Sequence, residues 1–205
     1  SVYSDVVDAV KAVHQAMLLR KHTQFAGFVL KQLDADVYVY TRALETPFFE
    51  FDWDVVFPKD PSGVPVVPEG YRIVGVYLSG EEPDALLHDT TNELFGDFFS
   101  PSALLTSLLL ARATPGCDVF FCAREGGLLR YQSDATESEA ELVTLLNRTH
   151  TTVSDIEARL FPYDRNAQSY VHRVAEAGKL EVITTDEVWT QEGRIGPDWA
   201  PFAVS

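Results

Sequence analysis

The fold of this chain is decided by residues 73–105, which read IVGVYLSGEEPDALLHDTTNELFGDFFSPSALL. An almost continuous apolar run up to Leu78 predicts a strand that is buried on both faces, as in the centre of a sheet. A polar loop follows, and Ser100 and Pro101 then have the residue types that begin a helix, a hydroxyl cap before a proline. The stretch therefore predicts a central strand that a long loop joins to a helix.

The surrounding segments have the patterns of an α+β domain. Apolar residues recur at helical spacing behind a capping Ser4. Two pairs of β-rich runs, around Asp34-Ala35-Asp36 and around Glu125-Gly126-Gly127, predict hairpins. Aromatic and acidic residues alternate over 48–57, which predicts a strand with one carboxylate face. We therefore expect, in chain order, a helix over 4–21, a hairpin over 25–42, a strand over 48–57 and a second hairpin over 117–132.

The sequence after residue 132 has a different character. Ser138 and Glu141 form a capping-box pattern, and Gly178 is placed to end a later helix. The run after Gly178 reads as one or two strands. We expect a core domain over residues 1–132 and a C-terminal extension over 133–205, helical with short strands, that packs on the core.

The charge of the chain limits its partners. Asp and Glu total 31 against 16 Lys and Arg, which gives a net charge of −15. A field of this sign repels nucleic acid and anionic lipid, and it suits a basic partner or plain solubility. No run of about 18 apolar residues predicts a membrane span. We therefore expect no nucleic-acid and no membrane partner, and another protein, a basic one, as the partner.

The two cysteines indicate a cellular compartment. Cys117 and Cys122 lie in one apolar run, and five residues along a strand place them about 16 Å apart, too far for a disulfide. Two buried free thiols suit a reducing compartment, so we expect a cytoplasmic protein. A nucleophilic thiol paired with His150 or His172 is an alternative, which burial disfavours because it raises a thiol pKa.

Four short motifs carry a family resemblance. TQFAGFVL, GYRIVGVYLSG, FFSPSALL and GGLLRYQ follow one another within about residues 3–132. In this order they resemble the JAB/JAMM (MPN-type) metalloprotease-like fold, and they are similar to uncharacterised bacterial domains linked to Rhs-type toxins. The resemblance implies an α+β fold with α/β/α-like layers, in which helices flank a mixed β-sheet. For active members it implies a zinc ion held by two His and one Asp, with a Glu as general base.

The positions that the resemblance assigns to this zinc site carry no ligands. The general-base position falls on Gln24, which cannot take a proton from water near neutral pH. The two His positions fall on Leu78 and Gly80, and the Asp position falls on Ala103. Of the signature only Ser100 is kept. Because zinc in a hydrolase needs three such ligands, we expect no metal, no cofactor and no catalysis at this site.

The leading hypothesis is a catalytically inactive JAB/JAMM-like domain. It would act as a protein-binding or accessory module in a bacterial toxin or interbacterial competition context. Side chains in or beside the loop after the central strand are its binding candidates: His88, Asp89, Glu93, Phe95, Phe98 and Phe99. The aromatic members could form the centre of an interface, or they could pack beneath the loop.

Two other functions stay open. A hydrolase with a displaced active site would use His88, Asp89 and Glu93, and it needs an open cleft beside Leu78 and Ala103. A structural module of a longer protein would dock its tail, from residue 133 onward, onto a neighbour.

Two further polar features have functional and structural interpretations. The row of Glu50, Asp52 and Asp54 could bind a cation, but carboxylates at period two usually face solvent and protect a sheet edge. Ser79, at the end of the central strand, lacks the glycine context of a nucleophile elbow. We therefore favour a turn-capping role for Ser79.

Overall fold

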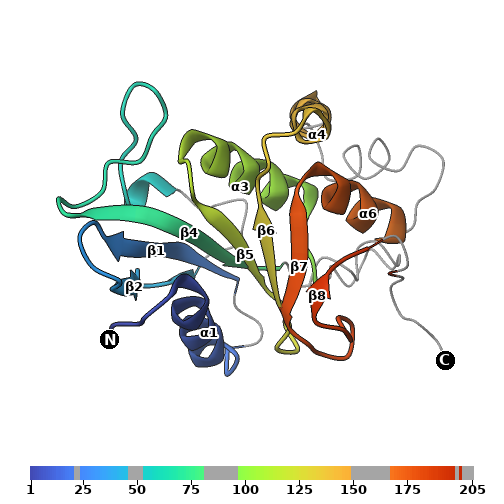
Figure 1. Cartoon of the computed structure of the whole chain (residues 1–205), viewed down its shortest axis with the longest axis horizontal. Helices are drawn as coiled ribbons and strands as arrows, with labels where there is room; N and C mark the ends of the chain where they lie inside the picture. Colours follow the sequence, from blue (N-terminus) through green and yellow to red (C-terminus); the bar gives the residue numbers. More distant parts are fainter. Residues whose placement is uncertain (21–23, 46–52, 81–96, 149–166, 197–198, 200–205) are drawn as a thin grey trace.

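The computed structural model contains an open mixed β-sheet with helices on both faces (Figure 1). It describes residues 1–20, 24–45, 53–80, 97–148, 167–196 and 199. The strands are β1 (Phe25–Gln32), β2 (Tyr38–Tyr40), β3 (Leu44–Glu45), β4 (Tyr71–Ser79), β5 (Asp118–Cys122), β6 (Leu128–Gln132), β7 (Lys179–Thr184) and β8 (Gly193–Arg194). The helices are α1 (Val6–Met17), α3 (Pro101–Ala113), α4 (Glu137–Arg148) and α6 (Ala167–Ala177), with a 3-10 turn η2 (Trp53–Val55).

The sheet has the strand order β2-β1-β4-β5-β6-β7-β8, and β3 pairs with β1. Strands β4 and β5 run parallel, with Gly75 opposite Asp118 and Ser79 opposite Cys122. The other pairings between described strands are antiparallel. Helix α3 makes the crossover that a parallel pair requires. The predicted α+β class, with a mixed sheet flanked by helices, is confirmed at this level.

Strand β4 lies inside the sheet, as its apolar run predicts. Its side chains divide between two apolar clusters, because successive residues of a strand point to opposite faces, and the pairing with β1 is irregular at Val74. Val76 and Leu78 belong to the cluster that also contains residues of α3, α4 and α6. Val74 and Tyr77 belong to the cluster that contains residues of α1. Figure 1 shows the same layers, with α1 on one face and the other three helices on the opposite face.

Two predicted helix starts are confirmed or corrected by their caps. Ser100 caps α3, since its side chain accepts a hydrogen bond from the backbone N–H of Ala103 at 3.3 Å. Helix α1 is capped by Asp5 instead of Ser4, because the Asp5 carboxylate accepts from the N–H of Asp8 at 2.8 Å. Helix α1 also ends at Met17, earlier than predicted.

Helix α4 begins earlier than its predicted capping box. The Thr136 hydroxyl accepts from the N–H of Glu139 at 3.1 Å and donates to the carbonyl of Ala177 at 2.6 Å. The second hydrogen bond explains why Thr136 is the N-cap where Ser138 was predicted, because it joins the start of α4 to the end of α6. The strand predicted over 48–57 is also wrong at Trp53–Val55, which form the 3-10 turn η2. Residues 46–52 of that prediction lie outside the described part of the chain.

The chain after residue 132 continues the sheet of the first 132 residues. Strand β7 pairs with β6 in antiparallel register, and β8 pairs with β7. Leu142 of α4 and Val174 of α6 are buried in the same apolar cluster as β4 and α3. None of the helices in the described chain combines the length and the hydropathy that crossing a bilayer requires.

Candidate functional site

The sequence-predicted site lies where β4 ends and α3 begins. The register of β1 against β4 pairs Ala26 with Leu78, so Gln24 and Gly80 lie just beyond this pair on neighbouring strands. Ser79 joins the two strand ends, because its hydroxyl accepts from the backbone N–H of Phe25 at 2.9 Å. Ser79 thus links β4 to β1, which is a different role from the turn cap expected for it.

Apolar packing fills two of the positions that the resemblance assigns to zinc ligands. Leu78 is fully buried and Ala103 is 3% exposed, and both belong to one apolar cluster. Phe28 and Phe121 contribute to the same cluster from β1 and β5. The residues present do not fit a zinc ion, because the strand end and helix start supply hydrocarbon where nitrogen and oxygen ligands are needed. Within the described residues, this packing covers Leu78 and Ala103 and leaves neither side chain facing an open cleft.

The binding candidates divide into two groups. His88, Asp89, Glu93 and Phe95 lie outside the described residues. Phe98 and Phe99 are fully buried.

The burial of Phe98 and Phe99 follows from a cluster of aromatic rings. The two rings meet edge to face, with centroids 5.3 Å apart. Phe98 also packs on Tyr170 at 5.5 Å and on Trp189 at 5.6 Å, and Phe99 packs on Phe121 at 5.0 Å. These two residues are therefore core residues and present no surface to a partner.

A buried ion pair that sequence reasoning missed lies directly before α3. Asp97 is 5% exposed, and its Oδ2 lies 3.3 Å from Nη2 of Arg124, which follows β5. Its carbonyl accepts from the indole N–H of Trp189 at 2.8 Å. Within the described part of the chain, Asp97 Oδ1 and Arg124 Nε have no hydrogen-bond partner. Burial raises the pKa of Asp97, and the nearby Arg124 opposes this change.

A histidine of α1 reaches the same end of the sheet. His14 is buried, and its Nε2 donates to the carbonyl of Ala123 at 2.9 Å. Burial lowers the pKa of His14, which favours the neutral ring. His14, Ser79 and Arg124 line a cavity of about 20 Å³. A volume of this size holds one water molecule, so a substrate has no room in it.

The structure gives little support to the alternative sites, which are the cysteine nucleophiles and the row of carboxylates. Cys117 and Cys122 are free and buried; burial raises the pKa of Cys117 to about 12 and also raises that of Cys122. Nucleophilic attack needs a thiolate, which these environments oppose. His172 Nε2 contacts the carbonyl of Trp199 at 2.9 Å, and His150 lies outside the described residues. Glu50 and Asp52 also lie outside them, whereas Asp54 is exposed.

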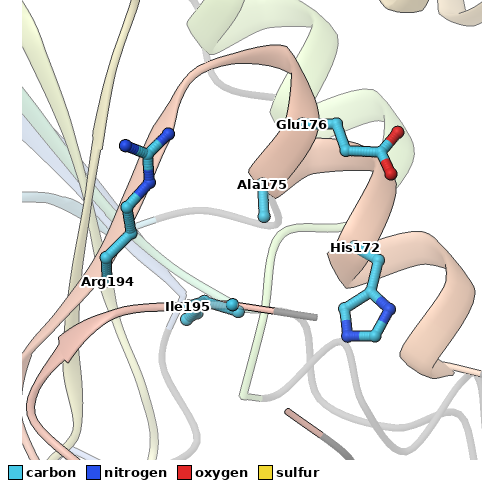
Figure 2. Close-up of a pocket in the computed structure, with 6 residues that line it drawn as sticks. His172, Ala175, Glu176, Arg194 and Ile195 are labelled. Atoms are coloured by element: carbon cyan, nitrogen blue, oxygen red, sulfur yellow. The ribbon is translucent and has the colours of Figure 1, made fainter. Parts of the chain in front are cut away.

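No group of three His, Cys, Asp or Glu side chains in the described part of the chain is arranged to hold a metal ion. A separate cavity of about 520 Å³ lies between α6 and the end of β8. Figure 2 shows Ala175 and Ile195 between Arg194 on one side and Glu176 and His172 on the other. The lining of the cavity thus combines apolar side chains with the charged side chains of Glu176 and Arg194.

Comparison with known proteins gives no match: no family model matches the chain, no curated protein matches it, and no solved structure matches it.

Proposed function

We propose that this chain is a JAB/JAMM-like domain without zinc chemistry that works as a protein-binding or accessory module. The burial of Leu78 and Ala103 in one apolar cluster is the observation that carries the proposal. A site that had lost one ligand could regain a metal through a neighbour. A site filled with packed hydrocarbon cannot do so without opening the core, since the core is close-packed.

The arrangement of the elements supports the family resemblance. A helix, a hairpin, an inner strand, a crossover helix and a second hairpin follow one another from α1 to β6. Gln24 and Gly80 lie at adjacent strand ends, and Ser100 caps the helix that follows the loop. This agrees with the order of motifs on which the resemblance rests.

Charge and surface support the binding role. The net charge of −15 favours a basic protein partner, by steering its approach more than by adding affinity. Apolar side chains are also exposed: Val55, at the end of η2, is 70% exposed, and Val66 is 57% exposed. Val66 belongs to the segment between η2 and β4, which projects from the sheet in Figure 1. A bacterial toxin or interbacterial competition context, inside the cytoplasm, fits an acidic accessory protein that holds a basic partner.

Metal analysis tests the loss of zinc chemistry. The full chain is purified from medium supplemented with zinc, and bound metals are measured by mass spectrometry before and after treatment with a chelator. We expect far less than one zinc per chain and an unchanged melting temperature after chelation. One zinc per chain, together with a fall in melting temperature on chelation, would contradict the proposal.

A binding experiment tests the second half of the proposal. The immobilised chain captures proteins from a bacterial lysate at low and at high salt, and each captured protein is then purified and mixed with the free chain. We expect a basic partner that forms a binary complex and whose association rate falls as salt rises. If no captured protein forms a complex with the purified chain, the binding role is rejected.

The second candidate function is a hydrolase whose active site lies away from the packed Leu78 and Ala103, and Asp97 is the observation that favours it. The buried Asp97 carboxylate follows directly after the segment that contains His88, Asp89 and Glu93, and its Oδ1 has no hydrogen-bond partner among the described residues. Hydrolysis of a peptide or ester library that is lost in His88→Ala and in Glu93→Ala would support this function over the binding role. Activity that survives both substitutions would exclude these residues.

A further inference from the structure

A cavity of about 410 Å³ lies at the C-terminal end of α3, away from the zinc-site positions at its N-terminal end. The lining comes from the last turn of α3, the turn into β5 and the loop between β6 and α4, and includes Ala111, Arg112, Gly116, Asp118, Ser133 and Ala135. These residues lie in the continuous described segment 97–148. Cavities of roughly 300–1,000 Å³ are the size that takes small molecules.

The guanidinium of Arg112 is held in place by a buried carboxylate. Glu139, on the first turn of α4, is fully buried and accepts from Arg112 Nη1 at 2.9 Å. Ser133 donates to the same carboxylate at 2.6 Å, and the Tyr131 hydroxyl donates to its other oxygen. Three donors from three elements thus fix Glu139, and Glu139 fixes one edge of the guanidinium.

Arg112 keeps most of its donors for another group. A guanidinium carries five N–H donors, and the bond to Glu139 is the one hydrogen bond of Arg112 within the described chain. Its side chain is 38% exposed and lines the cavity. A positioned guanidinium with free donors is the residue type that receives a carboxylate, because the two groups match in a two-point contact.

The same cavity also contains a group of opposite charge. Asp118, the first residue of β5, lines the cavity, and its side chain is 18% exposed. Gln132 Nε2 lies 3.3 Å from each of its oxygens, and Arg130 Nη1 lies 4.0 Å from Oδ2. The carbonyl end of α3, next to Ala111, adds partial negative charge on this side. The cavity therefore offers an anion receptor and a cation receptor across walls of small residues.

We propose that this cavity binds a free α-amino acid, whose carboxylate contacts Arg112 and whose ammonium group faces Asp118. The inference stands apart from the proposed protein-binding role, because it uses the opposite end of α3 and different residues. A doubly negative phosphate fits less well, since Asp118 would repel it. A simple cation fits less well because Arg112 faces the same space.

The test measures binding of each of the twenty L-amino acids to the full chain. Thermal shift at about 10 mM ligand selects the amino acids that stabilise the chain, and calorimetry then measures their dissociation constants. We expect at least one to bind with a Kd of about 1 mM or tighter. The N-acetyl derivative, which lacks the ammonium group, should bind about tenfold more weakly.

Two variants assign the contacts, and a third is the control. Asp118→Asn should lower the affinity for the free amino acid about tenfold and leave the affinity for its N-acetyl derivative unchanged. Arg112→Lys should lower the affinity for both ligands. Lysine keeps the positive charge beside Glu139 but cannot make the two-point contact with the ligand carboxylate. Asp134→Asn, which removes an exposed carboxylate from the neighbouring loop, should leave both affinities within about twofold.

Each contrary result overturns the proposal. The first is that no amino acid binds the unsubstituted chain saturably. The second is that the N-acetyl derivative binds with the same affinity as the free amino acid. The third is that Asp118→Asn lowers the affinity for both ligands equally. If Arg112→Lys unfolds, Asp118→Asn and the comparison of the two ligands on the unsubstituted chain still decide the question. Equal binding to Arg112→Lys and the unsubstituted chain would show that the carboxylate binds elsewhere.

Discussion

Removal of the Glu139 carboxylate should destabilise the protein more than most single substitutions. Glu139 connects three elements, through Arg112 of α3, Tyr131 of β6 and Ser133 of the following loop. It is fully buried, so bulk water does not replace its oxygens as hydrogen-bond acceptors. The perturbation is Glu139→Ala, which removes the acceptor and leaves its three donors in place.

The magnitude follows from what each donor loses. Breaking a buried ion pair by removal of one partner costs about 3–5 kcal/mol when the other charge stays buried. Arg112 is 38% exposed and regains water, which places the cost in the lower part of that range. The buried Tyr131 hydroxyl loses its acceptor, at about 1–3 kcal/mol. Together these losses give a total of about 4–6 kcal/mol, or a fall in melting temperature of about 15 °C for a chain of this length.

Urea unfolding at pH 7, followed by tryptophan fluorescence, measures this change. The buried Trp189 reports the transition. The control is Glu141→Ala on the same helix, where the side chain is exposed and the expected change is within about 0.5 kcal/mol. In a Tyr131→Phe background, Glu139→Ala should cost at least about 1 kcal/mol less, because one orphaned donor is gone. A loss below about 1 kcal/mol, or full additivity with Tyr131→Phe, would refute the reasoning.

Three further predictions concern the core. Gly27→Ala should destabilise by about 2 kcal/mol in urea unfolding, because a Cβ there would overlap the buried ring and hydroxyl of Tyr77. Asp97→Asn should raise the free energy of unfolding at pH 7. Burial raises the folded-state pKa of Asp97, so its ionisation costs stability as pH rises through that pKa, and the advantage of Asn should vanish below about pH 4, where the unfolded group is also protonated. The thiols of Cys117 and Cys122 should react with a disulfide reagent at pH 8 only after unfolding, because burial raises both pKa values.

Each of these predictions has a control and a contrary result. Gly196→Ala places a Cβ in open space and should change the free energy of unfolding by less than about 0.5 kcal/mol. An equally small effect of Gly27→Ala would show that the Tyr77 side chain moves aside at no cost in stability. If Asp97→Asn lowers stability at pH 7, the contact with Arg124 outweighs the cost of burial. Rapid reaction of either thiol in the folded protein, with a chain whose fluorescence stays native, would contradict its burial.

Features that depend on neighbouring residues were predicted from the sequence. The apolar run of β4, the turn at Glu125-Gly126-Gly127 and the cap at Ser100 each act within a few residues. The local pattern therefore decides the structure there, since strand period, turn conformation and capping are properties of short segments. The cap of α4 was misplaced because Thr136 is favoured by a contact with Ala177, 41 residues away.

The candidate sites divide in the same way. The sequence by itself determined that Leu78, Gly80 and Ala103 cannot ligate zinc, since side-chain chemistry needs no coordinates. Only the tertiary structure decided that Phe98 and Phe99 are core residues, since an apolar side chain beside a loop can pack inward or face a partner.

The buried polar contacts could not be predicted from the sequence. Residues 27 positions apart form both the Arg112–Glu139 and the Asp97–Arg124 pairs, and no local pattern marks either partner. The sequence was enough to predict the strand β4, the second hairpin and the cap of α3, and to show that Leu78, Gly80 and Ala103 offer no zinc ligand. The tertiary structure decided which charges are buried together and where cavities remain, because burial is a property of the packed whole and sets the cost of every unpaired polar group.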